Sequence, residues 1–195
     1  MKPGTRVLAI TLALTLVQVA LAATGRSTVP LPIGLNVTIL SVPAILAAIL
    51  VGPVSGVVVG AAFGLLSLAL ATSPLFHDPV VAVLPRLLIG PVAFGVYRFV
   101  RSANESLALV MAGGFGAATN TLLVLGLATV RTGPIGAPYI APAAAWEIIR
   151  RNVPAEAAIA GVIVLVVGLL ATGSAASARR PASRTGGAAK RRNRR

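Results

Sequence analysis

Long apolar stretches recur along this chain, and they constrain its fold more than any other feature. The first runs from Val7 to Ala23 without a charged residue, and comparable stretches follow as far as Ala171. About 20 mainly apolar residues are needed for a helix to cross the hydrocarbon core of a bilayer. Apolar residues make up 56% of the 195 positions and charged residues 11%, against about 45–50% and about 25% in soluble domains. The sequence therefore predicts an all-α integral membrane protein.

Gly, Pro and charged residues divide the apolar stretches into six predicted transmembrane helices, which we expect to form a compact bundle. Gly52 and Pro53 separate the second helix from the third, and a polar break over residues 72–79 precedes the fourth. Such residues mark turns and loops. A long connection over residues 131–151 is predicted before the sixth helix. The predicted spans are residues 6–23, 37–51, 54–71, 80–100, 107–130 and 153–171, within a membrane domain of residues 1–175.

The first apolar stretch has a second interpretation, as a cleaved signal peptide. It follows Lys2 and Arg6, and small residues flank Leu21. Signal peptides share a basic start, an apolar middle and small residues at the cleavage site. Their apolar part is about 7–15 residues long, and the uncharged run here is longer. The length favours a retained span.

The net charge of +13 is concentrated at the end of the chain. Eight of the 17 basic residues lie in residues 179–195, a segment without apolar periodicity. Residues 176–195 are therefore predicted to form a disordered tail. Nucleic-acid binding would require a basic folded surface with aromatic residues, so no nucleic-acid partner is expected. Basic residues favour the cytoplasmic side of a membrane, which places both termini of a six-span protein in the cytoplasm.

The residue inventory argues against several kinds of chemistry. The chain has no cysteine, one histidine and four acidic residues, so neither a metal site nor a cofactor is expected. The phosphate-binding motif of P-loop ATPases and the motifs G-x-S-x-G and H-E-x-x-H are all missing from the sequence. Ser67 and His77 remain as a weak pair for an intramembrane hydrolase. We expect the chain not to be an enzyme, and this hydrolase stays open as an alternative.

Small residues indicate how the predicted helices pack. Gly56, Gly60 and Gly64 recur every four residues in the third span, and Gly113 and Ala117 do so in the fifth. In a membrane, close approach of helix backbones at small residues is a main source of cohesion. These residues are expected to lie at helix–helix contacts.

Polar groups in or beside apolar spans are candidates for binding residues, because a charge at the bilayer centre costs about 2.5–3.5 kcal/mol on insertion scales. Most of them map to one end of the predicted spans. Arg86 could neutralise Asp78 or a carboxylate on a ligand. Glu156 follows Pro154 in the predicted first turn of the sixth helix, where the helix dipole alone would favour it. The set is Asn36, His77, Asp78, Arg86, Asn120, Trp146, Glu147, Asn152 and Glu156.

Four segments in order resemble the substrate-binding S components of energy-coupling factor (ECF) vitamin transporters. Residues 34–71 carry a polar N-x-T entry, a short helix with a proline and the pattern G-P-x-x-G-x-x-x-G. FHDPVVAVLPRLLIG (76–90), GAATNTLLVLG (116–126) and NVPAEAAIAG (152–161) follow. The resemblance covers about residues 7–171. The basic C-terminal tail has no counterpart in it.

The resemblance implies a six-helix protein of the bacterial plasma membrane that captures a vitamin or related micronutrient at its outer face. The implied partners are a membrane T component and two cytoplasmic ATPase subunits. Ala9 and Ala13 match the A-x-x-x-A motif through which the family contacts the T component, although packing within the bundle would also explain them. The implied substrate-binding residues are Asn36, His77, Asp78, Arg86, Asn152 and Glu156, with Asn120 facing the pocket and Trp146 in a loop that covers it.

Two further interpretations remain besides transport. A multi-span scaffold or morphogenesis protein would share the hydrophobic profile but bind no small molecule. An intramembrane hydrolase would depend on Ser67. On the transport interpretation, the cation of Arg86 pairs with a carboxylate of the ligand, and a pantothenate- or folate-like compound would suit such a site.

Overall fold

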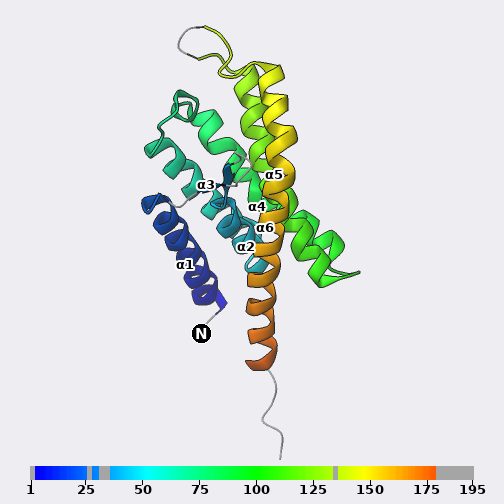
Figure 1. The fold of residues 1–195 in the computed structure, drawn as a ribbon. Helices are drawn as coiled ribbons and strands as arrows, with labels where there is room; N and C mark the ends of the chain where they lie inside the picture. Colours follow the sequence, from blue (N-terminus) through cyan, green and yellow to red (C-terminus); the bar gives the residue numbers. More distant parts are fainter. Residues whose placement is uncertain (1–2, 26–27, 31–35, 134–135, 179–195) are drawn as a thin grey trace, which may run out of the picture.

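The computed structural model describes residues 3–25, 28–30, 36–133 and 136–178, which form a bundle of helices with one short hairpin (Figure 1). Helices α4, α5 and α6 are the longest, and β1 and β2 pair as antiparallel strands. The elements are α1 (Pro3–Ala23), β1 (Thr28–Pro30), β2 (Asn36–Thr38), α2 (Ser41–Leu50), α3 (Pro53–Ala69), the 3-10 turn η1 (Pro74–His77), α4 (Pro79–Val100), α5 (Glu105–Val130) and α6 (Pro142–Ala178).

Helix starts follow local sequence signals. Proline occupies the first position of α3 and α4, where its fixed φ suits the helix and its missing N–H is not needed. The Asp78 side chain caps α4 by accepting a hydrogen bond from Val80 N at 2.9 Å. Asn104 caps α5 in the same way through Leu107 N, also at 2.9 Å. These caps satisfy backbone donors that the first helical turn leaves free.

Each of the six predicted apolar stretches contains an α-helix, and four of these helices are long and apolar enough to cross a membrane. The four are α1, α4, α5 and the Pro142–Ala171 part of α6. Helix α2 has 10 residues and α3 has 17. At about 1.5 Å per residue, α2 covers about half of a hydrocarbon core about 30 Å thick. The helical fold class is confirmed, while the count of six transmembrane helices stays a prediction.

Two boundaries differ from the sequence-based expectation. The predicted loop over residues 131–151 is wrong in its second half, because α6 begins at Pro142 and continues through Pro154. Alanines and other strong helix formers follow Pro142, and they favour an early start. The second predicted span begins as strand β2, and α2 starts only at Ser41. Of the predicted tail, the first three residues continue α6, and residues 179–195 lie outside the described part of the chain.

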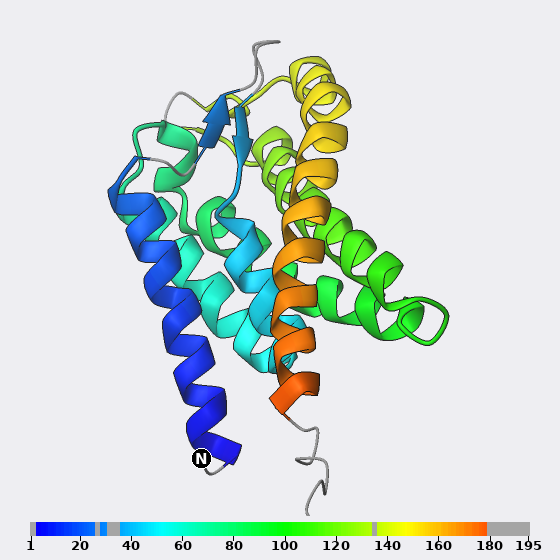
Figure 2. The same ribbon diagram turned by 60° about the horizontal axis from the view of Figure 1, so that its bottom comes forward.

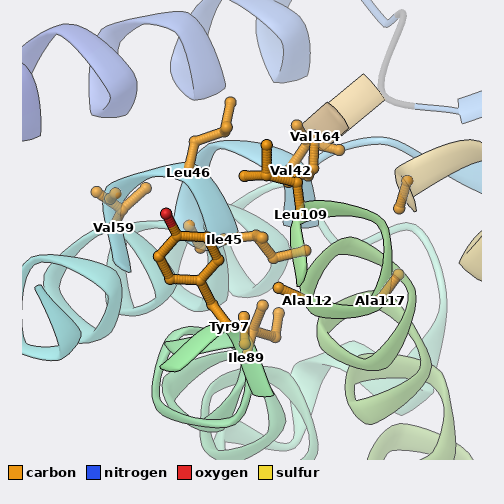
Figure 3. Packing of buried hydrophobic residues seen from close by; sticks show 14 of the residues in the cluster. Val42, Ile45, Leu46, Val59, Ile89, Tyr97, Leu109, Ala112, Ala117 and Val164 are labelled. Atoms are coloured by element: carbon orange, nitrogen blue, oxygen red, sulfur yellow. The ribbon is translucent and has the colours of Figure 1, made fainter. Parts of the chain in front are cut away.

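Helix α2 lies at the centre of the bundle and supplies much of the core. Eight of its residues are buried, and Ile45 is completely enclosed. Figure 3 shows Ile45 and Val42 of α2 facing Ile89 of α4 and Leu109 of α5. By contrast, α1 packs on α2 and α3 along one side (Figures 1 and 2). Only 11% of the residues in its most apolar stretch are buried.

The bundle has two distinct ends. The start of α1 and the C-terminal end of α6 lie at the same end in both views (Figures 1 and 2). Figure 2 shows the β1–β2 hairpin, η1 and the connection between α5 and α6 at the opposite end. We refer to this second end as the hairpin end.

The predicted close packing at glycines is confirmed for α3 and α4. A Cβ added at Gly60 would overlap the carbonyl oxygen of Arg86, and one at Gly56 would lie 2.9 Å from the Cα of Gly90. A Cβ at Gly64 would lie 2.8 Å from the Cα of Val83. These separations are too short for any side chain, so the two helices touch through their backbones. This backbone contact fixes the position of Arg86 along the length of α3.

Candidate functional site

A cavity of about 590 Å³ opens at the hairpin end, bounded by the end of α1 and by β2, α3, η1, α4, α5 and α6. Its volume is within the range of small-molecule sites, about 300–1,000 Å³. Most of the wall is apolar, with a few polar side chains placed among leucines and phenylalanines. The polar lining consists of Thr38, Ser67, Thr72, Arg86, Asn120, Thr121 and Glu156.

Arg86 of α4 supplies the cation of this cavity. The residue is 3% exposed, and its guanidinium carbon lies 5.2 Å from the ring centre of Phe63 and 5.0 Å from that of Phe76. Such contacts with aromatic faces stabilise a cation when it is desolvated. Nη1 donates one hydrogen bond, to the carbonyl of Val81 at 2.6 Å, and Nε has no partner within the described residues.

No carboxylate among the described residues forms an ion pair with Arg86. A buried charge is costly unless it is paired and hydrogen-bonded. A guanidinium has five N–H donors in a fixed fork that matches a carboxylate or phosphate. The arrangement is therefore suited to an anionic group that enters the cavity.

Glu156 supplies a carboxylate on another wall of the same cavity. The residue is 6% exposed. Its Oε1 accepts a hydrogen bond from Thr38 N at 3.4 Å, and its Oε2 accepts one from the hydroxyl of Thr121. The expectation that Glu156 lies in the first turn of the sixth helix is wrong, because α6 starts at Pro142. The helix dipole is concentrated at a helix terminus, so capping does not explain this carboxylate.

Asn120 of α5 is the third predicted residue that lines the cavity. It is 6% exposed, and its Oδ1 has no hydrogen-bond partner within the described residues. The next residue, Thr121, bonds Glu156. Asn120 and Glu156 therefore belong to the same side of the site, formed by α5 and α6.

Asp78 pairs with Arg131 and not with Arg86, the partner that the sequence suggested. Its carboxylate accepts a hydrogen bond from Nε of Arg131 at 2.8 Å and is 7% exposed. This bond from Arg131 lowers the pKa of Asp78, against the opposite effect of burial. The pairing of Asp78 with Arg86 is thus wrong: Asp78 joins the start of α4 to the end of α5, and the cation of Arg86 stays available.

Three other predicted residues, His77, Trp146 and Asn152, are absent from the described cavity lining, and a fourth, Asn36, is not placed relative to it. His77 is exposed, with Nε2 3.2 Å from the carbonyl oxygen of Ala71. Trp146 is 62% exposed and lies on α6, where a covering loop had been expected. Asn152 is half-buried on the same helix. Asn36 belongs to β2, and its side chain lies outside the described part of the structure.

Glu147 also lies away from the cavity, on the surface of α6. It pairs with Arg150 at 2.8 Å and with Arg151 at 3.5 Å. Pairs this exposed contribute little to stability, about 0–1 kcal/mol. Glu147 is therefore an exposed carboxylate on the helix that also carries the buried Glu156.

The residues missed from the sequence are those that surround the charges. Phe63 lies three residues after Gly60, on the face of α3 that packs against α4, so its spacing could have predicted contact with Arg86. Thr121 directly follows Asn120. Phe76 lies in the polar break, where no periodicity indicated its direction. Hydroxyl and aromatic groups are common in apolar spans, so their presence there indicates a binding site less strongly than a charged group does.

The hydrolase pair is not assembled. Ser67 lines the cavity, but His77 contacts a backbone carbonyl, and no hydrogen bond joins these two side chains in the part of the chain that is described. A nucleophilic serine requires a base within about 2.6–3.2 Å. The geometry does not favour this chemistry.

The two alanines of the predicted docking motif lie on the exposed side of α1. Ala9 and Ala13 are both exposed. On the opposite side, two polar contacts between described residues hold α1 to the bundle. Thr11 donates a hydrogen bond to the hydroxyl of Ser55 at 3.1 Å, and Gln18 donates one to the carbonyl of Leu40 at 2.6 Å. Packing within the bundle therefore does not account for the alanines.

Comparison with known proteins identifies a family that the chain matches over most of its length. A family model described as ECF transporter, substrate-specific component, matches residues 7–176. A search of the curated proteins finds no match. The matched range includes every residue of the cavity lining and the whole of α1 from Val7 onward.

Proposed function

The chain belongs to the substrate-specific components of ECF transporters, and on this premise we propose that it captures a vitamin or related micronutrient in the cavity around Arg86. The observation that carries the proposal is a buried guanidinium that lines a cavity without a carboxylate partner in the described chain. Binding and release need no nucleophile. The chain supplies affinity and specificity, and partner subunits supply the energy.

The ligand is proposed to carry a carboxylate that meets Arg86. A pantothenate- or folate-like compound satisfies this requirement. Asn120 and Glu156 are proposed as further contacts, since both line the same cavity. For Asn36, His77, Trp146 and Asn152, substrate contact stays a prediction. Asp78 is occupied by Arg131, and its proposed task is to hold the cavity wall in place.

The protein is a multi-pass membrane protein, and its orientation is part of the proposal. The start of α1 and the end of α6 share one end of the bundle, which supports placing both termini on the cytoplasmic side of a bacterial plasma membrane. The cavity at the hairpin end then opens outward. A T component with two cytoplasmic ATPase subunits is proposed to complete an importer.

Mass spectrometry of the small molecules that co-purify with the protein tests the capture proposal. We expect one compound with a carboxylate to be enriched in the purified protein. A matched preparation of an unrelated membrane protein from the same cells is the control. A scaffold or morphogenesis protein would carry no such compound, so repeated absence of any enriched molecule contradicts the proposal.

Docking on the T component is expected to depend on the exposed alanines of α1. The double substitution Ala9→Leu and Ala13→Leu should lower recovery of the complex on the order of tenfold or more, because small residues let helix backbones approach closely. The measurement is co-purification with a tagged T component. Ala9→Ser with Ala13→Ser keeps the side chains small and should still dock. Normal assembly of the leucine variant would assign the alanines to the lipid-facing surface.

A further inference from the structure

The cavity contains two opposite charges on separate walls. Arg86 lies with Phe63 and Phe76 on the side formed by α3, η1 and α4. Glu156 lies with Asn120 and Thr121 on the side formed by α5 and α6. Within the described residues the two charges form no ion pair with each other. The cavity is therefore dipolar, with a cation on one side and a carboxylate on the other.

The hydrogen bonds of Glu156 leave it able to bind a ligand. Among the bonds that the described residues make, one reaches each carboxylate oxygen, from Thr38 N and from the Thr121 hydroxyl. An ionised carboxylate offers about four acceptor positions, so two are left open by these two bonds. The acceptor oxygen of Asn120 on the same side is also without a partner in the described chain. This wall therefore presents acceptors that call for N–H donors.

A ligand with only an anionic group would match one side of the cavity and leave the other unsatisfied. Its negative charge would enter a low-dielectric space that already contains Glu156, where like charges repel strongly. A ligand with only a cationic group would meet the same difficulty at Arg86. A molecule with an acidic group at one end and donor nitrogens at the other satisfies both sides.

We propose that the ligand is amphoteric, with an anionic group bound by Arg86 and an amino or ring N–H group bound by Glu156 and flanked by Asn120. This inference rests on the proposed function and narrows its substrate class. Of the two compound types considered above, the folate-like type has both groups. The pantothenate-like type has a carboxylate but no amino or ring nitrogen, and it leaves Glu156 without a nitrogen donor of that kind.

A competition among known compounds tests the inference on the full-length protein. The cells are grown with equal amounts of folate, pantothenate and thiamine, which is a cation without a carboxylate, and the retained compounds are identified by mass spectrometry. Retention of folate, or of a host compound with both an acidic group and an amino or ring N–H group, is the expected result. Retention of pantothenate or thiamine alone overturns the amphoteric class but leaves capture standing. Retention of nothing overturns the proposed function as well.

Substitution of Glu156 tests whether its carboxylate binds the amino or ring N–H group of the ligand. Glu156→Gln keeps the shape of the side chain and removes its charge, and retention of the amphoteric compound should fall on the order of tenfold or more, since truncating one partner of a buried charged pair is costly. Glu147→Gln on the surface of the same helix is the matched control and should retain the compound fully. Equal retention by Glu156→Gln and the wild type overturns the assignment. If this variant does not fold, the competition on the wild type decides alone.

Discussion

Substitution of Arg86 by Gln is expected to lower ligand affinity by about 2–4 kcal/mol, on the order of 30- to 1,000-fold. The guanidinium is buried against two aromatic rings and makes a single hydrogen bond to the part of the chain that the structure describes. An anionic group of the ligand would supply the missing partner, so removal of the cation leaves that group desolvated and unpaired. Binding of the co-purifying compound, measured by isothermal titration calorimetry in detergent, checks the prediction.

The same substitution should not destabilise the protein without ligand. A buried charge without a partner costs free energy, so the Arg86→Gln protein is expected to unfold thermally at the same temperature as the wild type or above it. Arg86→Lys keeps the charge but loses the planar fork and should bind with intermediate affinity. Arg150→Gln, at an exposed arginine of α6, serves as the control. Unchanged affinity in Arg86→Gln would show that the ligand lies elsewhere.

The second large effect is expected at Gly60. Gly60→Ala places a Cβ against the carbonyl oxygen of Arg86, which belongs to the backbone and cannot rotate away. Overpacking of this kind costs about 1–3 kcal/mol. To relieve the overlap, α3 and α4 must separate at the level of Arg86. We therefore expect both a lower unfolding temperature in detergent and weaker ligand binding.

A matched substitution separates this contact from general effects of glycine replacement. Gly126 lies in α5 with nothing within 4 Å of an added Cβ. Gly126→Ala should be neutral or stabilising by up to about 1 kcal/mol, because alanine favours helices. Similar stability and ligand affinity in the Gly60→Ala and Gly126→Ala proteins would contradict the proposed backbone contact between α3 and α4.

The sequence predicted features whose cause is local or compositional. Runs of apolar residues predicted six helices, since a membrane permits few other structures. Gly60 was assigned to a helix contact from its spacing alone. Arg86, Asn120 and Glu156 were identified because polar groups in apolar spans are costly. Each of these inferences uses a rule that applies to one segment at a time.

Features that depend on which segments meet in space were not predictable in this way. Arg131 partners Asp78 across 53 positions of sequence, and nothing near either residue indicates the pair. The sequence does not predict the long α6, because Pro154 favours a helix start at that point, whereas α6 continues through it. The division of the cavity into a cationic side and an acidic side also depends on the packing of α3 and α4 against α5 and α6.

The position of Trp146 has a practical consequence for spectroscopy. It is the single tryptophan of the chain and is 62% exposed on α6, two residues before Ile148 of the cavity wall. The intrinsic fluorescence of the protein at tryptophan wavelengths therefore comes from one site beside the cavity. The chain also has no cysteine, so a single engineered thiol could carry an acceptor dye at any chosen position. Trp146 can thus serve as the single fluorescence donor in energy-transfer measurements at the mouth of the cavity.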